Sequence, residues 1–462
     1  MTNIKNTLLR TGIWALSGLL AFPALALAQQ TAPQATAPAA PQQPSLSLPE
    51  ALQIALKNSM GIQIARNNLS IAGIYNSFGY AGGLPQVTAS GSDVETSSNV
   101  KQSFTDPANN KNVHNAVSNN LSGSVNAGML LYNGQRVVTT RKRLGAQEAQ
   151  SRLVLSSRAL GIVYNVTLKY YDIIRQQSYA KTLQASIDAS RQRLDIVKSQ
   201  QAVGVANNAD LFQSQVDLNT QLQNLQAQQL VVDQGKTDLL TLLTLNPDST
   251  VVIADTILVD RSITLESILT GVQTNPDIAA ADEQVRINTY LEKETAAQRY
   301  PSLAVNAGFN FTHIHNSTGV STSGVSILSN QNYGPFGGVS VAIPIFNGFI
   351  YKKQQEAAGI NIRTAKLQRD TLMLNYTANA VKNWQAYNNN LLQLETAQAN
   401  FELSQKLLSL VTQRFQLRVA TIVDVKNAQQ SFENAGYLMI NTSFAAKAAE
   451  ITLRRYANQL TH

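Results

Sequence analysis

The chain has 462 residues, with 36 Lys and Arg against 28 Asp and Glu and a formal net charge of +8 at pH 7. This surplus is too small to indicate a nucleic-acid partner. Cys is absent, so neither disulfides nor the acylated N-terminal Cys of a bacterial lipoprotein is expected. Charged residues make up 14%, well below the roughly 25% usual for globular domains, and Gln, Asn, Ser and Thr supply the polarity.

Residues 1–28 have the pattern of a secretory signal peptide. Lys5 and Arg10 precede an apolar run from Ile13 to Leu25, and Ala26-Leu27-Ala28 is a small-residue cleavage signal. Export is therefore expected, and removal of the two bases lowers the net charge to about +6. No later apolar stretch reaches the 18 residues or so of a membrane-spanning helix, so strands would have to do any spanning.

Residues 29–47 are rich in Pro, Ala and Gln and are predicted to form an extended tether. The alternative is an arm that docks on the folded chain. The tether leads into the first predicted helix.

The remainder of the chain repeats itself. Residues 50–69 align with 266–285, Pro85 with Pro301, LYNG (131–134) with IFNG (345–348), and Val205-Ala206 with Val419-Ala420, all at offsets near 215 residues. We therefore predict two structural repeats, 48–246 and 263–458, with an equatorial linker at 247–262 and a tail at 459–462. Each repeat is predicted as helix, two strands, long helix, helix.

The predicted helices carry heptad repeats, which favour helices packed along their length. The matching positions in the two halves are Leu211, Leu218, Leu225, Val232 and Leu239, and Val425, Phe432, Met439, Ala446 and Leu453. The long helices, 135–203 and 349–417, would each extend about 100 Å. The shorter helices (48–80 and 210–245; 264–300 and 424–458) add up to the same length in line, which predicts a slab of uniform height.

Four segments alternate in polarity and are predicted as strands: 85–96, 120–132, 301–314 and 334–346. Each is about as long as a tilted strand that crosses a bilayer. Tyr132 and Phe346 lie at strand ends, where aromatic side chains favour the membrane interface and outer-membrane lipid. The polar segments 97–120 and 315–334 are predicted as outer loops; the alternative is a pair of soluble hairpins.

Four strands cannot close a barrel, and an open sheet edge cannot lie in lipid because its backbone groups would lack partners. Several chains must therefore share one barrel. Three chains would supply twelve strands above and a helical tube below.

The two helical breaks, VGVANNADL (203–211) and VATIVDV (419–425), each precede a helix with an Asp near its start. The structural interpretation is that Asp210 and Asp424 satisfy free N–H groups and suit the helix dipole.

Several features together resemble the TolC family of outer-membrane efflux proteins: the duplicated halves, LPQ (84–86), the (Y/F)-N-G strand exits and RFQLRVATIVDVKNAQQSF (414–432). The resemblance covers about 47–458. It implies a mainly α fold with a β membrane part: a homotrimer with a shared 12-stranded β-barrel and a long α-helical periplasmic tunnel. It also implies a passive exit channel in the outer membrane, for a tripartite efflux pump or type I secretion. A periplasmic adaptor and an inner-membrane pump, proton-driven or ABC, would be its partners.

The same resemblance implies that the two breaks form the periplasmic tip of the tunnel. Asp424 would belong to an acidic ring at its mouth, with Asp210 at the matching position of the first half. The residues expected to form the turns and contact the adaptor are Gly204, Val205, Ala206, Arg418, Val419 and Ala420. Three positions depart from the family pattern: Asn427 replaces a second ring carboxylate, Ala420 a locking Arg, and Arg418 a Gly.

No catalytic motif occurs, so an enzyme is not expected, and neither is a cofactor. His313 and His315 would share a strand face, but an incidental pair is favoured over a metal site. The alternative function is a trimeric coiled-coil structural or adhesive surface protein with a small β membrane anchor.

Overall fold

Eight α-helices and four strands make up the parts of the chain described by the computed structural model, residues 45–317 and 328–460. These parts fall within one compact unit, Pro44–His462. The predicted signal peptide, the tether up to residue 44 and residues 318–327 of the predicted outer loop 315–334 lie outside the described residues. The helices are α1 (Leu48–Asn58), α2 (Met60–Tyr75), α3 (Arg136–Ala202), α4 (Asn208–Leu242), α5 (Leu265–Val272), α6 (Pro276–Ala297), α7 (Ile350–Gln416) and α8 (Ile422–Tyr456). The strands are β1 (Gln86–Gln102), β2 (Lys111–Asn133), β3 (Ser302–Asn316) and β4 (Ser329–Ala342), with a short 3-10 helix η1 (Pro107–Asn109) between β1 and β2.

The two halves follow one plan, residue for residue, in their long helices. Both α3 and α7 have 67 residues, and both α4 and α8 have 35. The residues that precede the long helices also match, since Gln135 and Phe349 both have a φ of 63°. The duplication thus extends to the backbone conformation of the turns.

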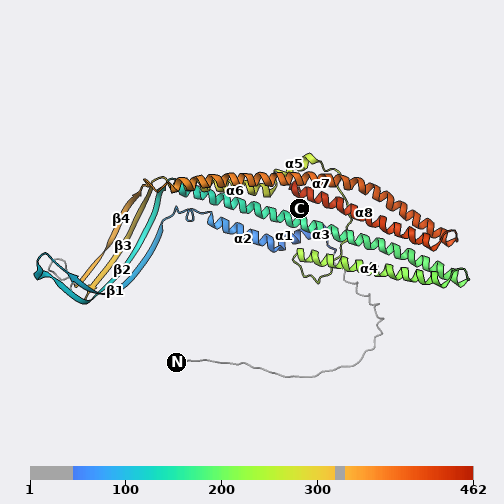
Figure 1. The fold of residues 1–462 in the computed structure, drawn as a ribbon, viewed down its shortest axis with the longest axis horizontal. Helices are drawn as coiled ribbons and strands as arrows, with labels where there is room; N and C mark the ends of the chain where they lie inside the picture. The colour runs from blue at the N-terminus through green and yellow to red at the C-terminus, as the bar shows by residue number, and fades with distance from the viewer. Residues whose placement is uncertain (1–44, 318–327, 461–462) are drawn as a thin grey trace, which may run out of the picture. The chain divides into compact units, whose positions relative to one another are not determined.

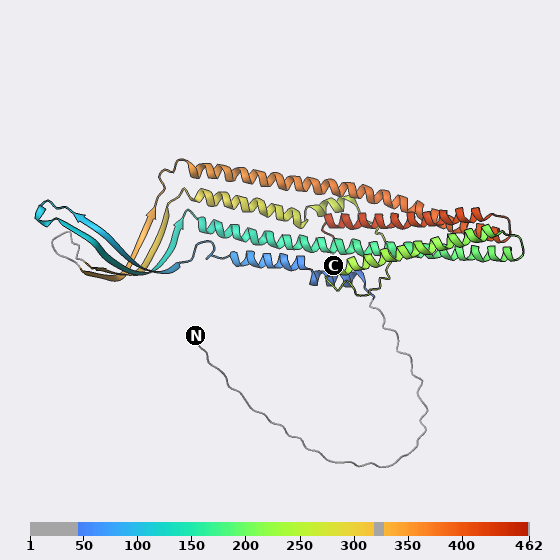
Figure 2. The same cartoon turned by 60° about the horizontal axis from the view of Figure 1, so that its bottom comes forward.

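The helices form a layer whose members change along its length (Figures 1 and 2). Near the sheet, the neighbours in order are α2, α3, α6 and α7; near the far end they are α4, α3, α8 and α7. The long helices α3 and α7 run through both parts, while α2 and α4 occupy the same side of α3 in turn, and α6 and α8 share the position between α3 and α7. This is the arrangement predicted from the helix lengths.

Two apolar clusters hold the middle of the helical layer together. One surrounds Tyr170 and Leu239 and includes residues of α1, α3 and α4; the other surrounds Tyr387 and Leu453 and includes residues of α5, α7 and α8. Leu46, at the end of the predicted tether, packs on the first cluster and its N–H donates to the Val252 carbonyl at 2.9 Å. Residues 45–47 are therefore docked, and the tether prediction extends too far toward the helix.

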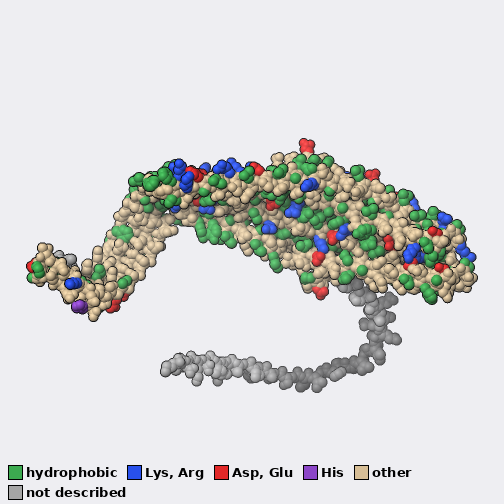
Figure 3. Space-filling model, in the orientation of Figure 1, with side chains coloured by type: hydrophobic (Ala, Val, Ile, Leu, Met, Phe, Trp, Pro, Cys, Tyr) green, Lys and Arg blue, Asp and Glu red, His purple; other side chains and the backbone are tan. Residues whose placement is uncertain are grey.

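The strands form one antiparallel sheet in the order β1-β2-β3-β4. Its register separates two faces. Apolar residues such as Val87, Ala127 and Val305 share one face, and Ser90, Ser124 and Asn310 share the other, where the Ser90 and Ser124 hydroxyls lie 2.9 Å apart. A bulge between Leu130 and Tyr132 moves Tyr132 onto the apolar face, opposite Leu303. Figure 3 shows few charged side chains over the visible face of the sheet.

The predicted outer loop at 97–120 is wrong over most of its length. β1 continues to Gln102 and β2 begins at Lys111, so the connection is short. Polar residues extend the ladder because they bond across it: the Asn119 amide, for example, donates to Asp93 at 2.8 Å. The composition of this segment is typical of a loop, but cross-strand hydrogen bonds make most of it part of the sheet.

Three other predicted boundaries also differ from the structure. The predicted helix 48–80 is two helices, because Ser59 ends α1 and caps α2 by accepting from the Ile62 N–H. The predicted helix 264–300 is broken likewise at Asn275, whose side chain caps α6. The strand predicted at 334–346 runs instead from Ser329 to Ala342, so the end of the predicted loop 315–334 is strand, and Phe346 lies outside the sheet with 76% of its surface exposed.

Within the described residues, none of the helices combines the length and the apolar character that crossing a membrane would need.

Candidate functional site: the turns at the far end of the helical layer

The α3–α4 and α7–α8 turns have the same construction. After α3 the chain passes through Gly204 with a φ of 78°, and the Val205 N–H returns to the Gln200 carbonyl at 2.9 Å. After α7 it passes through Arg418 with a φ of 63°, and the Val419 N–H returns to the Arg414 carbonyl at 2.8 Å. Both turns thus end a long helix with a left-handed residue followed by a bond back into the last helical turn.

The N-cap residues of α4 and α8 are not the Asp residues that the sequence predicted. Asn207 caps α4 by accepting from the Asp210 N–H at 2.8 Å, and Thr421 caps α8. Asp424 completes a capping box, since its Oδ2 accepts from both the N–H and the hydroxyl of Thr421 at 2.8 Å. Within the described residues, the Asp210 carboxylate makes no hydrogen bond or ion pair.

The Asp424 carboxylate is exposed and its charge is stabilised locally. The hydrogen bond from the Thr421 N–H holds the pKa of Asp424 below its ordinary value, and the Thr421 hydroxyl adds to this effect. The Asp424 side chain is therefore ionised at neutral pH, and its carboxylate is oriented by Thr421 at the start of the same helix.

The two turns meet in one small apolar cluster. Ala206 and Ala420 both pack against the buried residues Val197, Phe415 and Val425. Ala420, at the position where the family resemblance implies an Arg, is therefore a packing residue. Val205 and Val419, one position earlier in each turn, are exposed, and so is Asn427.

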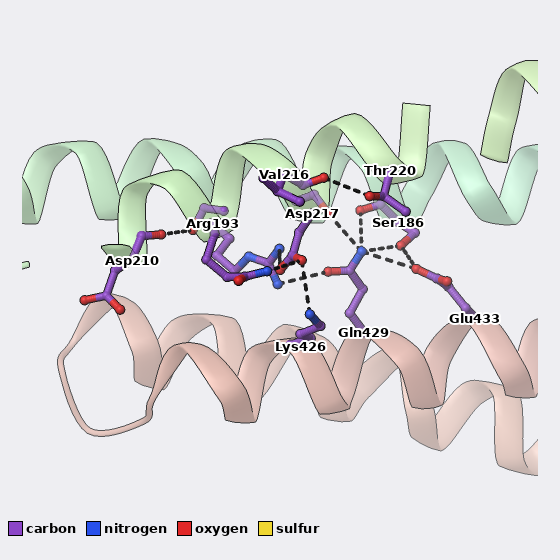
Figure 4. A network of polar contacts seen from close by, with 12 residues as sticks. Ser186, Arg193, Asp210, Val216, Asp217, Thr220, Lys426, Gln429 and Glu433 are labelled. Carbon is purple, nitrogen blue, oxygen red and sulfur yellow. Dashed lines mark hydrogen bonds and ion pairs between the residues drawn. The ribbon is translucent and has the colours of Figure 1, made fainter. Parts of the chain in front are cut away.

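Behind the turns lies a buried polar network that the sequence analysis missed (Figure 4). Arg193 of α3 is 1% exposed, and its Nη2 lies 2.9 Å from the Asp217 carboxylate of α4. Lys426 of α8 donates to the same carboxylate at 3.1 Å. Asp217 therefore joins three helices from both halves of the chain.

Gln429 of α8 extends this network along α3. Its amide nitrogen lies 2.6 Å from the Ser186 hydroxyl and 2.8 Å from that of Ser190, and its oxygen faces Arg193 at 3.5 Å. Ser186 also bonds to the Glu433 carboxylate. Burial lowers the pKa of Arg193, and the charge of Asp217 opposes that shift. Within a buried site, such a paired Arg stays protonated at neutral pH.

A close backbone approach supports the network at its other end. A Cβ placed on Gly436 of α8 would lie 2.7 Å from the Thr182 methyl of α3. α8 and α3 therefore pack tightly at Gly436. One signal in the sequence could have indicated this network. Ser186, Ser190 and Arg193 of α3 are small or polar residues at the spacing typical of the buried positions of a heptad.

The remaining predicted site residues lie elsewhere. Tyr132 is on the apolar face of the sheet, far along the chain from the turns, and His313 and His315 also share that face. Within the described residues, no group of three or more His, Cys, Asp and Glu side chains is arranged to hold a metal ion.

Comparison with known proteins identifies the family. The family model for the outer membrane efflux protein matches residues 51–244 and 272–459, so the chain belongs to that family, a family of transport channels. The TolC-family resemblance read from the sequence is thereby confirmed. A comparison with curated protein sequences gave no match.

Solved structures show the same fold. The outer membrane protein VceC of Vibrio cholerae is 17% identical, with 89% of this chain and 95% of that chain covered and a TM-score of 0.71. The CmeC outer membrane channel of Campylobacter jejuni is 16% identical, with 89% and 85% covered and a TM-score of 0.68. The MtrE outer membrane channel of Neisseria gonorrhoeae, in its open state, is 15% identical, with 90% and 89% covered and a TM-score of 0.68. The mainly α fold with a four-stranded antiparallel sheet is thus that of TolC-like outer-membrane channels.

Proposed function

We propose that this chain forms a homotrimeric exit channel in the outer membrane, a passive conduit of a tripartite efflux pump or a type I secretion system. The observation that carries the proposal is that, within the described residues, the sheet and the helical layer both end in edges that no further element covers. The outer strands are β1 and β4, and the outer helices near the sheet are α2, which precedes β1, and α7, which follows β4.

The sheet edges favour closure by further copies. Among the residues that the structure describes, β1 pairs only with β2 and β4 only with β3, which leaves one hydrogen-bonding edge of each outer strand without a partner there. Because such edges cannot lie in lipid, β4 of one copy would pair with β1 of the next. The apolar face, with Val87, Val305 and Val339, would face lipid, and the hydroxyl-rich face would line the bore.

The helix edges carry matching apolar stripes. On α2 the exposed residues Ile64, Ile71 and Ile74 recur at helical spacing, and on α7 the exposed residues Ile360, Leu367 and Leu374 recur every seven residues. Figure 3 shows hydrophobic side chains exposed over both helices. Exposed stripes of this extent favour an interface, here between α7 of one copy and α2 of the next.

The turns are proposed as the periplasmic tip. Three Asp424 carboxylates would converge there with Asp210 and Asn427 of each copy, forming a weakly acidic mouth that favours cations. Gly204, Val205, Val419 and Arg418 are exposed and would contact the adaptor, with Ala206 and Ala420 packed beneath. In this proposal the inner-membrane pump supplies the energy for export.

The second candidate function, a structural or adhesive surface protein with a β anchor, accounts less well for the sheet. One face of the sheet is rich in hydroxyl and amide groups, with Ser90, Ser124 and Asn310 in one row; in the proposed channel this face lines the bore. An anchor has no need for such a lining.

Conductance in planar bilayers distinguishes these functions. The purified full-length protein should produce discrete current steps. A membrane-inserted protein that produces none would contradict the channel and favour the anchor.

A further inference from the structure

An open hollow of about 460 Å³ lies where the sheet meets the helical layer. Arg136 at the start of α3, Tyr300 after α6 and Tyr351 at the start of α7 lie in its wall. Asn133, Gln298 and Ser302 add polar groups, and Leu130, Ile343 and Pro344 add apolar ones. The hollow therefore combines one cation, two phenol rings and a mixed lining.

Arg136 is available for a ligand. Its side chain is exposed, and within the described residues it has no hydrogen-bond or ion-pair partner. Arg143, two turns further along the helix, differs because its Nε is held by Glu294 at 2.7 Å. No acidic residue lines the hollow, so the charge of Arg136 is uncompensated within it.

The backbone before α3 packs closely against the segment that carries Tyr300. Gly134, in the turn before α3, has a φ of 65°, and a Cβ placed there would lie 2.8 Å from both the Tyr300 Cβ and the Ala297 carbonyl oxygen. The turn that carries Arg136 is thus pressed against the segment that carries Tyr300. The backbone segments that carry Arg136 and Tyr300 are therefore held close together by the fold.

The register shows on which face the hollow opens. Leu130 pairs with Ala304 and Ser302 with Ala342, and these residues share the face of the Ser90–Ser124 pair. That face lines the bore in the proposed trimer, so this inference rests on the proposed function for its access to cargo.

We propose that the hollow binds organic anions with a planar aromatic group, such as aromatic carboxylates, during their passage. The guanidinium would hold the carboxylate through paired N–H donors, and the tyrosine rings would contact the aromatic plane. Three copies would place three such sites around the junction of the tunnel and the barrel. The channel would thus have a weakly acidic mouth and a basic, aromatic site at the junction of tunnel and barrel.

Binding is tested directly on the full-length protein in detergent, by saturation-transfer NMR with 1-naphthoate as the probe and 1-naphthylmethylammonium as its cationic counterpart. The wild type should bind the naphthoate and not the amine. Arg136→Gln should weaken naphthoate binding about tenfold, since a charge-assisted pair is lost. Tyr300→Leu should weaken it about fivefold through loss of ring contact.

Lys142→Gln is the matched control, because it removes an exposed positive charge from the same helix outside the hollow. It should leave naphthoate binding unchanged. Equal binding of both probes, or equal affinity of the wild type and Arg136→Gln, would overturn the proposal. The readout is independent of conductance, so a silent bilayer recording would refute the channel without deciding the site.

Discussion

Gly204 and Arg418 occupy the same position in the two halves of the chain, and both have a left-handed backbone, with φ of 78° and 63°. An L-residue other than Gly is strained in this region by roughly 1–2 kcal/mol. The turn of the second half therefore contains backbone strain at Arg418 that Gly204 avoids in the first half. This turn is part of the proposed mouth of the channel.

Arg418→Gly should raise the free energy of unfolding by about 1 kcal/mol, because the strain is removed. Arg418→Ala is the control: it removes the same side chain and keeps the strained backbone, so it should give no such gain. Thermal unfolding followed by circular dichroism measures both. A gain of the same size in Arg418→Ala would assign the effect to the Arg side chain and contradict the backbone explanation.

Asp217→Ala should lower the free energy of unfolding by about 3 kcal/mol, because Arg193 would stay buried without its counter-charge. Asp188→Ala breaks the exposed pair with Arg191 and should cost under about 0.5 kcal/mol. Denaturant titration of both variants gives the comparison. Equal losses would show that the buried Arg193–Asp217 pair contributes no more to stability than the exposed Asp188–Arg191 pair.

Gly436→Ala should destabilise the protein, because the added methyl would meet the Thr182 methyl at 2.7 Å. We expect a loss of about 1–3 kcal/mol. Thr182→Ser removes the opposing methyl, so the double variant should recover part of the loss. Failure of this rescue, with additive losses, would show that the Thr182 methyl is not the group that opposes the added methyl.

Much of this fold was predictable from the sequence, and the failures have physical causes. The repeat predicted one plan for both halves, and the heptads predicted α4 and α8, because their apolar spacing is regular over many turns. Ser59 was missed because a Ser inside an apolar pattern looks like one polar position, whereas its hydroxyl ends one helix and caps the next. The extension of β1 and β2 was missed because Ser and Asn are typical of loops until a partner strand is known.

The candidate site was predictable only at its turns. Gly204 and the Asp residues signal a helix end and restart locally. The Arg193–Asp217–Lys426 network needs three helices to be brought side by side, and Lys426 is more than 200 residues from both partners in sequence. No local pattern reports such a contact.

The Asp424 capping box should make stability depend on pH. The folded pKa of Asp424 is lowered, so its contribution is present above the unfolded pKa, about 4, and is lost as pH falls through the folded value. Asp424→Asn should therefore lower the thermal midpoint at pH 6 and converge with the wild type toward pH 2. A constant difference across this range would exclude the ionised cap as its source.

Asp424 should also contribute to ion selectivity if it lies at the mouth. Asp424→Ala should reduce the preference for cations, measured as a smaller reversal potential across a salt gradient in planar bilayers. Glu402→Ala, at an exposed position on α7 away from the turn, is a charge-matched control. An unchanged reversal potential in Asp424→Ala would remove Asp424 from the constriction.

The joining of α7 from one copy to α2 of the next can be tested most directly by cross-linking, because the chain contains no Cys. Ile71→Cys on α2 is combined in turn with Ile360→Cys, Leu367→Cys or Leu374→Cys on α7, and the protein is oxidised in membranes. Because the interface repeats around a closed ring, at least one pair should give covalent dimers and trimers, while each single variant stays monomeric on a denaturing gel. Monomers from every pair, together with a single-copy mass for the native protein in detergent, would contradict the shared conduit.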